Sequence, residues 1–299
     1  MKKVEIVKNI INQNPNFLIC PICNMPLSCT QTNSLLCNNN HCYDISKKGY
    51  INLLPSLSNN DYGRDMLESR RIVTRNGFFN NMLQAISEFI LNFSKENLLG
   101  DIKILDAGCG EGSHLIDIIR KVKKINNSKI QGVGIDISKE GILIASRDIS
   151  DILWCVGDLS RIPANLQCFD VILNILSPSN YKEFQRVLKD DGILIKVIPG
   201  EKYLEELRSY FYKDTEKKSY SNNKVLSHFE DNFITLTKKK LTYQSELSIE
   251  NLKHLINMTP LSWNVNAATV EKLLSIGIAS ITADFTLLIG KKGIITKQH

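Results

Sequence analysis

Ile104-Leu105-Asp106-Ala107-Gly108-Cys109-Gly110-Glu111-Gly112 is the stretch that decides the fold of this 299-residue chain. Its apolar start predicts a short buried strand that ends at Asp106. The three glycines at alternate positions predict a tight turn that opens a helix, because glycine adopts positive φ and lets the backbone come close to a ligand. The free N–H groups at the start of that helix would face the ligand. The stretch therefore predicts a strand, a turn and a helix that together bind a cofactor.

Two classes of cofactor site use glycine turns of this kind. A dinucleotide site spaces its glycines G-x-G-x-x-G, whereas this chain has G-x-G-x-G with Asp106 two residues before the first glycine. A pyrophosphate would also be poorly served by Asp106 and Glu111 beside it. The stretch resembles the first motif of class I S-adenosylmethionine-dependent methyltransferases, D/E-x-G-x-G-x-G. This resemblance implies that Gly108, Gly110 and Gly112 hold S-adenosylmethionine.

Helices and strands are predicted to alternate after the turn. The spacing of apolar residues favours helices over 115–125, 138–147, 181–188 and 251–256, and strands over 130–136, 154–158, 169–175, 192–198 and 282–289. Such alternation is typical of a right-handed parallel βαβ sheet. We therefore predict an α/β fold with the Rossmann-like sheet of a class I methyltransferase.

Polar side chains stand at the carboxyl ends of four predicted strands, where ligands bind in parallel sheets. They are Asp106, Asp136, Asp158 and Asn174. Asp136 suits the two ribose hydroxyls of the cofactor, and Asp158 is placed to accept a hydrogen bond from an adenine amino group. One terminal acid could be a helix cap, but four in register favour a binding site. The loop over 174–179 is expected to face the methyl group and the acceptor.

Five of the eight cysteines fall between residues 20 and 42. Cys20 and Cys23 form a C-x-x-C pair, and Cys37 and His41 follow at a spacing that suits a tetrahedral site for structural zinc. Cys42 rivals His41 for the fourth position. Four protein ligands leave no open coordination position, so no catalysis is expected at this metal. The pattern predicts a small N-terminal zinc module that depends on its metal for shape, since so short a segment buries little core.

The chain divides into two predicted domains, a zinc-ribbon-like RNA-recognition module over 1–60 and a methyltransferase domain over 61–299. The alternation over 50–53 predicts a strand that closes the module. Helices predicted over 65–75 and 79–93 should cap the methyltransferase domain at its cofactor end.

Composition and charge restrict the partners and the cellular compartment that we expect for this protein. The net charge of +6 is compatible with a nucleic-acid partner, and the arginines at 64, 70, 71 and 75 form its densest basic group. No apolar run approaches the ~20 residues that span a bilayer, and charges interrupt the N-terminal residues, so neither a membrane segment nor a secretory signal is expected. Cysteines in such a chain suggest metal binding or packing rather than disulfides. We expect a cytoplasmic enzyme with no membrane partner.

Local motifs along nearly the whole chain resemble those of the bacterial 23S rRNA guanine-N1 methyltransferases, and in particular their Gram-positive branch. Beyond the glycine turn, the matching stretches are Cys20-Pro-x-Cys23, Lys47-x-Gly-Tyr-x-Asn-Leu-Leu-Pro55, Arg70-Arg71 with Gly77, Ser177-Pro178, Pro199-Gly200 and Met258-Thr-Pro-x-x-Trp263. The last of these is informative because generic methyltransferases lack it. The order of a zinc module followed by a methyltransferase domain also matches.

The resemblance implies a reaction, a partner and further site residues. The reaction is methyl transfer from S-adenosylmethionine to N1 of a guanine in a domain II hairpin of 23S rRNA. The implied zinc ligands are Cys20, Cys23, Cys37 and His41. The implied cofactor contacts add Phe79, Glu111 and Tyr203 to the glycines, although relatives can have Tyr and His where this chain has Phe79 and Tyr203. Relatives also include dimers, so a homodimer is one implied assembly.

Two rival functions remain open from sequence. A methyltransferase acting on a small molecule or a protein would share the glycine turn, but its sugar- and quinone-type relatives lack the cysteine pairs. An RNA-binding protein with an inactive methyltransferase domain would have no need to keep acids at 106, 111 and 136, yet all three are acidic.

Overall fold

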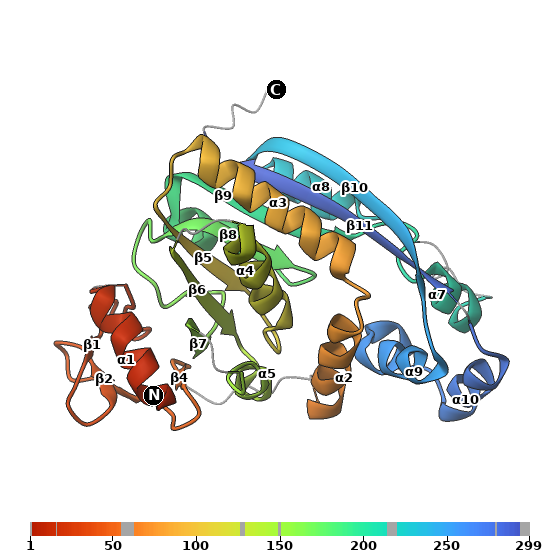
Figure 1. Ribbon diagram of the computed structural model, residues 1–299, viewed down its shortest axis with the longest axis horizontal. Helices are drawn as coiled ribbons and strands as arrows, with labels where there is room; N and C mark the ends of the chain where they lie inside the picture. The colour runs from red at the N-terminus through yellow and green to blue at the C-terminus, as the bar shows by residue number, and fades with distance from the viewer. Residues whose placement is uncertain are drawn as a thin grey trace.

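A single large sheet organises the molecule (Figure 1). The computed structural model describes residues 2–15, 17–54, 63–125, 129–148, 151–213, 220–278 and 280–293. Within these residues the sheet has eight strands in the order β10-β11-β9-β8-β5-β6-β7-β4. The predicted boundary between residues 60 and 61 lies outside the described residues.

Parallel strands form the middle of the sheet, as the sequence predicts. They are β5 (Asp101–Ala107), β6 (Lys129–Asp136), β7 (Ile152–Val156), β8 (Phe169–Ile175) and β9 (Leu188–Pro199). The closing strand β11 (Ser280–Lys291) runs antiparallel to β9, and β10 (Ile234–Glu246) runs antiparallel to β11. Strand β10 has no counterpart among the predicted elements. The carboxyl ends of the parallel strands meet at one edge and create the place for a ligand.

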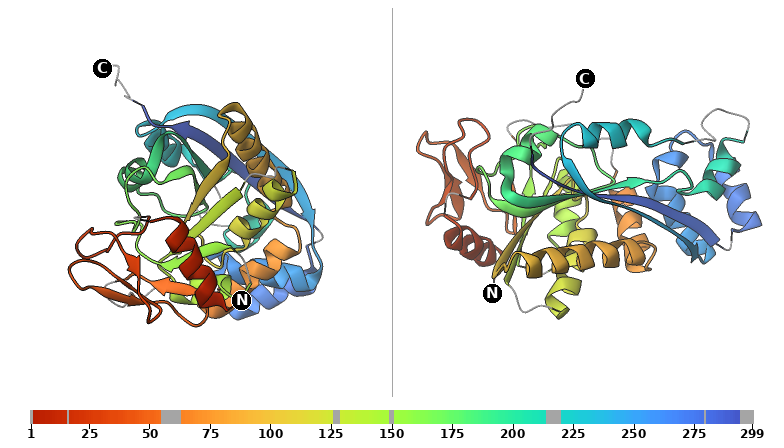
Figure 2. Two further views of the ribbon diagram at one scale, coloured as in Figure 1. Left: turned by 60° about the vertical axis from the view of Figure 1, so that its left-hand side comes forward. Right: turned by 90° about the horizontal axis from the view of Figure 1, so that it is seen from above.

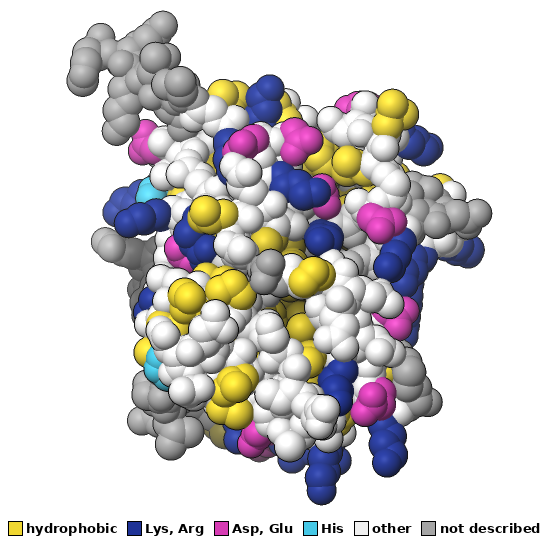
Figure 3. All heavy atoms as spheres, turned by 90° about the vertical axis from the view of Figure 1, so that its left-hand side faces the viewer, with side chains coloured by type: hydrophobic (Ala, Val, Ile, Leu, Met, Phe, Trp, Pro, Cys, Tyr) yellow, Lys and Arg dark blue, Asp and Glu magenta, His cyan; other side chains and the backbone are white. Residues whose placement is uncertain are grey.

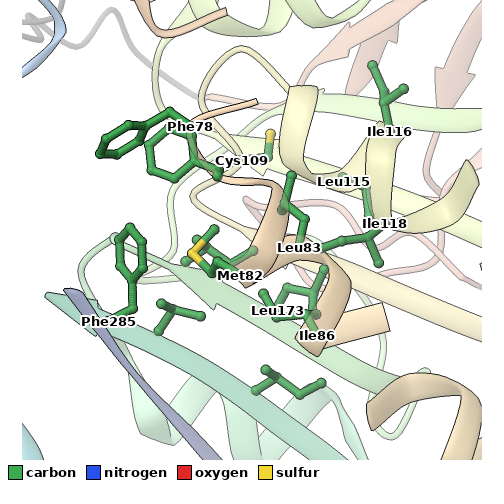
Figure 4. Packing of buried hydrophobic residues seen from close by; sticks show 14 of the residues in the cluster. Phe78, Met82, Leu83, Ile86, Cys109, Leu115, Ile116, Ile118, Leu173 and Phe285 are labelled. Atoms are coloured by element: carbon green, nitrogen blue, oxygen red, sulfur yellow. The ribbon is translucent and has the colours of Figure 1, made fainter. Parts of the chain in front are cut away.

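Three helices cover one face of this sheet, α3 (Asn80–Glu96), α4 (Ser113–Ile125) and α5 (Lys139–Ala145). Their apolar side chains recur every three or four residues, so one stripe of each helix faces the strands. Figure 4 shows this layer, in which Met82 and Leu83 of α3, Leu115 of α4 and Leu173 of β8 pack together. The two views of Figure 2 show α3 lying along the sheet.

The opposite face is covered by α1 (Lys3–Gln13), α6 (Tyr181–Val187) and α8 (Asn223–Glu230) together with the cysteine-rich module. The module has its own small sheet of β1 (Ser28–Cys29), β2 (Ser34–Leu36) and β3 (Cys42–Asp44). Leu27 and Leu35 of the module share a core with Val133 and Leu153 of the large sheet. The module therefore packs on the large sheet and does not hold its shape alone.

The strand predicted to close the module also joins the large sheet. Strand β4 (Tyr50–Asn52) pairs in parallel with β7 and extends the edge of the large sheet. An antiparallel bridge between Ile45 and Ile51 also links it to the module. The prediction of a strand is confirmed, whereas its pairing with β7 is a long-range contact that local alternation of apolar residues does not specify.

A group of helices surrounds the carboxyl edge of the sheet. They are α2 (Arg64–Arg75), α7 (Glu205–Phe211), α9 (Ile249–Met258), the 3-10 turn η2 (Pro260–Ser262) and α10 (Ala267–Ile276). Helix α2 is tied to α9 through a hydrogen bond between Ser69 and His254 and another from Asn257 to Ser69. Among the described helices, none has the length and apolar character needed to cross a membrane.

Candidate cofactor and metal sites

The glycine turn follows β5 directly, as predicted, and its backbone demands glycine. Gly108, Gly110 and Gly112 have φ of 84°, 57° and 81°, a region that side chains with a Cβ rarely adopt. A Cβ on Gly108 would come within 1.8 Å of the Ser177 hydroxyl oxygen, and one on Gly112 within 2.6 Å of the Trp154 ring. The turn is therefore packed closely against Ser177 and Trp154. In addition, any residue other than glycine would strain its backbone.

Three acidic side chains meet around this turn with little access to water. Asp106 is 2% exposed and Glu111 is 1% exposed. Burial raises the pKa of Asp106 to about 7, with the Arg70 guanidinium opposing the rise and the Asp136 and Glu111 carboxylates adding to it. Burial is also the main cause that raises the pKa of Glu111 and Asp136. One oxygen of Asp106, Oδ1, has no hydrogen-bond partner.

Asp136 links the end of β6 to the turn. Its Oδ2 accepts a hydrogen bond from the Gly110 N–H at 2.7 Å, and its Oδ1 accepts one from the Ser138 N–H at 2.8 Å. Each carboxylate oxygen has a further lone pair, so Asp136 keeps acceptor capacity toward a ligand.

A cavity of about 240 Å³ opens beside these residues at the carboxyl ends of β5, β6, β7 and β8. Gly108, Gly110, Asp136, Asp158 and Asn174 were all predicted near one another. The first four line this cavity. Asn174 lies fully buried beneath it, at the end of β8.

The residues of this cavity fit S-adenosylmethionine. A sulfonium cation would favour the ionised form of the buried carboxylates, whose burial otherwise raises their pKa. The open lone pairs of Asp136, which lines the cavity, are acceptors for the cofactor's donors. Asp136 would hold the ribose and Asp158 the adenine. The glycine turn would hold the rest of S-adenosylmethionine.

The loop after β8 is held by a network that sequence reasoning missed. Asn174 donates its amide protons to the carbonyl oxygens of Ala107 and Pro178, both at 2.9 Å. Lys196 of β9 is 3% exposed and donates to Asn174 Oδ1 and to the Ser179 hydroxyl, each at 2.6 Å. Burial lowers the pKa of Lys196 to about 8. The sequence signal for this network is the position of Lys196 inside the otherwise apolar run 193–198, since a lysine in a buried strand needs polar partners.

Besides Asn174, five of the predicted cofactor residues do not line this cavity, namely Phe79, Asp106, Glu111, Gly112 and Tyr203. Phe79 is fully buried and packs edge-on against His114, with their ring centroids 4.8 Å apart. Tyr203 lines a neighbouring cavity and packs on Phe285 at 5.1 Å. Phe285 also lies 6.0 Å from Phe79, so the three rings form one aromatic cluster. Their contact with the cofactor stays a prediction.

The arginine group on α2 divides into two kinds. Arg71 is buried and donates to the Asp148 carboxylate at 3.0 Å, so it fixes the fold rather than meeting a phosphate. Arg70 lines the cofactor cavity, which sequence reasoning did not anticipate. Arg64 and Arg75 keep 59% of their side chains exposed and remain candidates for RNA contact.

The predicted zinc ligands come together in the N-terminal module. One donor atom from each of Cys20, Cys23, Cys37 and His41 lies within 4.8 Å of the other three. The Cys23 and Cys37 sulfurs are 3.6 Å apart, and Nδ1 of His41 lies 3.4 Å from the Cys37 sulfur. Zinc–sulfur bonds of about 2.3 Å in a tetrahedron give similar edges. The donor set therefore fits zinc.

The competition between His41 and Cys42 is decided by position. Cys42 is exposed and lies outside the cluster of donor atoms. Burial would raise the pKa of Cys20, but hydrogen bonds from Tyr43 and from the Cys23 and Ile22 backbone bring it down to about 6. A thiol with a lowered pKa is ready to bind metal as a thiolate. Arg161, in the segment after β7, donates to Asn24 at 3.0 Å and links the module to the rest of the chain.

The strand order, the glycine turn and the buried carboxylates define a class I S-adenosylmethionine-dependent methyltransferase, and the Cys3His cluster adds a zinc module. Comparison with known families agrees with both parts. Residues 18–59 match the family described as "RlmA, N-terminal", and residues 99–254 match the family described as "Methyltransferase domain".

Curated relatives extend over almost the whole chain. The Bacillus subtilis protein YxjB, provisionally assigned as a 23S rRNA (guanine-N(1)-)-methyltransferase, is 39% identical, and the match covers 91% of this chain and 96% of YxjB. The 23S rRNA (guanine(748)-N(1))-methyltransferase of Streptomyces fradiae is 23% identical and covers 94% of this chain and 98% of that protein. The chain belongs to the family of 23S rRNA (guanine-N1)-methyltransferases.

Proposed function

We propose that this protein transfers the methyl group of S-adenosylmethionine to N1 of a guanine in a domain II hairpin of 23S rRNA. The observation that carries the proposal is the likeness to YxjB, which extends through both the zinc module and the methyltransferase domain. The carboxylate-lined cavity supports the cofactor, and the module beside it supports a large polynucleotide substrate. We infer a cytoplasmic protein because its substrate is ribosomal RNA.

The chemistry asks the protein mainly for positioning and exclusion of water. S-adenosylmethionine, when bound, supplies a methyl group already activated on a sulfonium. Asp136 and Asp158 hold the nucleoside part, and the buried carboxyl of Asp106 stabilises positive charge. The loop over 174–179, fixed by Lys196, presents Ser177 and Pro178 to the cavity.

The RNA is held outside the cavity through backbone charge and shape. Figure 3 shows the face that carries the zinc module, where Lys and Arg side chains stand around the edges with acidic side chains between them. Arg64 and Arg75 are exposed and add positive charge to α2, where Arg64 also pairs with Glu68 and Arg75 with Asp148. The target guanine leaves its stack and enters the site, at a cost of a few kcal/mol.

The guanine N1 proton must leave before, during or after transfer. Asp158 and Ser177 are the candidate groups, since both line the cavity. A purely positioning role, with Asp158 holding adenine and Ser177 shaping the loop, is the alternative for each.

The test is methyl transfer from labelled S-adenosylmethionine to 23S rRNA that lacks the modification, mapped by reverse-transcription stops. A stop at one guanine of domain II is the expected result, because N1 methylation blocks base pairing. Gly108→Ala should abolish transfer, since its Cβ would meet Ser177, whereas Gly100→Ala, where a Cβ meets nothing within 4 Å, should retain it.

Labelling of no RNA, with the cofactor still bound, would exclude the rRNA substrate and favour a small-molecule or protein acceptor. The family resemblance also leads us to infer a homodimer. Light scattering coupled to size-exclusion chromatography of the full chain measures that assembly directly.

A further inference from the structure

A second cavity, of about 460 Å³, lies between α7 and η2. Its walls include three tyrosines, one arginine and the Met-Thr-Pro segment, namely Tyr203, Tyr212, Tyr220, Arg208, Thr259 and Pro260. This segment is the motif that generic methyltransferases lack, and the cofactor site makes no use of it. The cavity is therefore a candidate for the site that binds this family's methyl acceptor.

Two of the tyrosine rings are held in place as stacking surfaces. The Tyr212 hydroxyl donates to the Leu261 carbonyl oxygen at 2.9 Å. This bond joins Tyr212, at the end of α7, to η2 and so fixes the orientation of the Tyr212 ring. The Arg208 guanidinium lies 5.3 Å from the centre of the Tyr220 ring. Unstacked bases bind to proteins by stacking on aromatic rings and on guanidinium planes.

Arg208 brings a buried charge to this cavity. It is 5% exposed, and it donates to the backbone carbonyl oxygens of Glu201 and Tyr203. Within the described residues no carboxylate forms an ion pair with it. A guanidinium has five N–H donors, so several remain for a ligand. The pairing that arginine makes most often with a base is to O6 and N7 of guanine.

The loop after β8 and the end of β9 connect this cavity to the cofactor cavity. Leu176, which lines the cofactor cavity, donates its N–H to the Val197 carbonyl oxygen at 3.0 Å, two residues before Pro199 of the second cavity. The two cavities are therefore neighbours. A base whose O6 and N7 face Arg208 would keep its N1 edge free to face the methyl group.

We propose that the cavity between α7 and η2 receives the unstacked guanine, with Tyr212 and Tyr220 stacking on the base and Arg208 recognising O6 and N7. This inference rests on the proposed function and names the substrate pocket for it. A rival pocket of about 490 Å³ also borders the cofactor cavity, which it meets at Asp158 and Pro178. The experiment must separate the two pockets.

Photo-crosslinking locates the base directly. A domain II hairpin carrying 6-thioguanosine at the guanine mapped by reverse transcription is irradiated with the full-length protein, and the crosslinked peptide is sequenced. We expect crosslinks within 203–212, at Tyr220 or within 259–261. Crosslinks at 178–182 or at His228, with the unsubstituted hairpin still methylated, would overturn the pocket and leave the function standing. If the protein does not methylate the unsubstituted control hairpin, the proposed function is wrong, and the proposed guanine pocket is wrong with it.

Tyr220 provides a matched pair of variants. Tyr220→Leu removes the ring and should lower kcat/KM for the hairpin about tenfold or more, in line with the contribution of one stacked base. Tyr220→Phe keeps the ring and should stay within about twofold of the unchanged protein. The dissociation constant for S-adenosylmethionine should not move in either variant. Equal losses in both variants, or a loss explained by weaker cofactor binding, would contradict the stacking role.

A change in the RNA tests Arg208 without risk to the fold. Replacing the target guanosine by 7-deazaguanosine removes the N7 acceptor and should lower kcat/KM of the unchanged protein several-fold. Arg208→Lys should lose activity on the normal hairpin but show little further loss on the 7-deaza hairpin. If the loss in kcat/KM from Arg208→Lys and the loss from 7-deazaguanosine multiply when the two changes are combined, Arg208 does not contact N7.

Discussion

Asp106 is the buried acid before the glycine turn, and its ionisation opposes the stability of the fold. Its carboxyl is buried with one oxygen lacking a partner, so the empty protein holds an acid that resists ionisation. Burial raises its pKa from 3.8 to about 7. Because the folded state binds this proton more tightly than the unfolded chain, ionisation costs stability progressively between about pH 4 and pH 7, and fully above that range.

Asp106→Asn should therefore stabilise the cofactor-free protein at pH 8 and change it little at pH 4. The shift of about three pKa units sets an upper limit on the order of 4 kcal/mol. Thermal unfolding across this pH range measures it, with Asp191→Asn as an exposed control. The same variant should bind S-adenosylmethionine more weakly. A stability difference that does not grow with pH would show that Asp106 is not the titrating group.

Among elements, the loop after β8 owes its shape to a strand that is distant in sequence. Lys196 reaches from β9 to the Asn174 side chain, the Ser177 carbonyl oxygen and the Ser179 hydroxyl. Such a buried network loses more than one hydrogen bond when its centre is removed.

Lys196→Met should lower kcat for methyl transfer about tenfold or more, because the loop that faces the methyl group loses its anchor. Lys196→Arg should recover part of this loss by keeping the positive charge. Lys291→Met, on the neighbouring strand β11 and exposed, is the control and should have little effect. Single-turnover rates at saturating cofactor are the measurement. Equal rates for Lys196→Met and the control would refute an anchoring role.

The elements also show what sequence could and could not predict. Local apolar spacing predicted the parallel strands, and the polar residues at their ends predicted the cofactor edge. Strand β10 was missed because its face alternates between exposed and half-buried, and the lysines at 238–240 looked like a solvated run. Arg70 was counted in the basic group that suits a nucleic-acid partner, and the fold places it in the lining of the cofactor cavity. Long-range placement of this kind, like the pairing of β4 with β7, leaves no periodic signal in the chain.

On the scale of the whole molecule, the zinc module and the methyltransferase sheet share one hydrophobic core. Apolar residues of α1 and of the module pack on the same face of the sheet as α6 and α8. Strand β4 and the hydrogen bond from Arg161 to Asn24 add polar links. Loss of the metal should therefore destabilise more than the module, because collapse of the module uncovers the sheet behind it.

Cys37→Ser and Cys42→Ser test this coupling as a pair. Cys37 belongs to the donor set and is buried, whereas Cys42 is exposed and lies outside it. Cys37→Ser should lose zinc, measured by elemental analysis, and lower the Tm of the full chain by roughly 5 to 15 °C. Cys42→Ser should keep one zinc per chain and the original Tm. Because none of the zinc ligands lines the cofactor cavity, Cys37→Ser should weaken binding of the rRNA hairpin more than binding of S-adenosylmethionine at low temperature. A variant that loses zinc yet melts as a unit at the original Tm would mean that the module folds independently of the sheet.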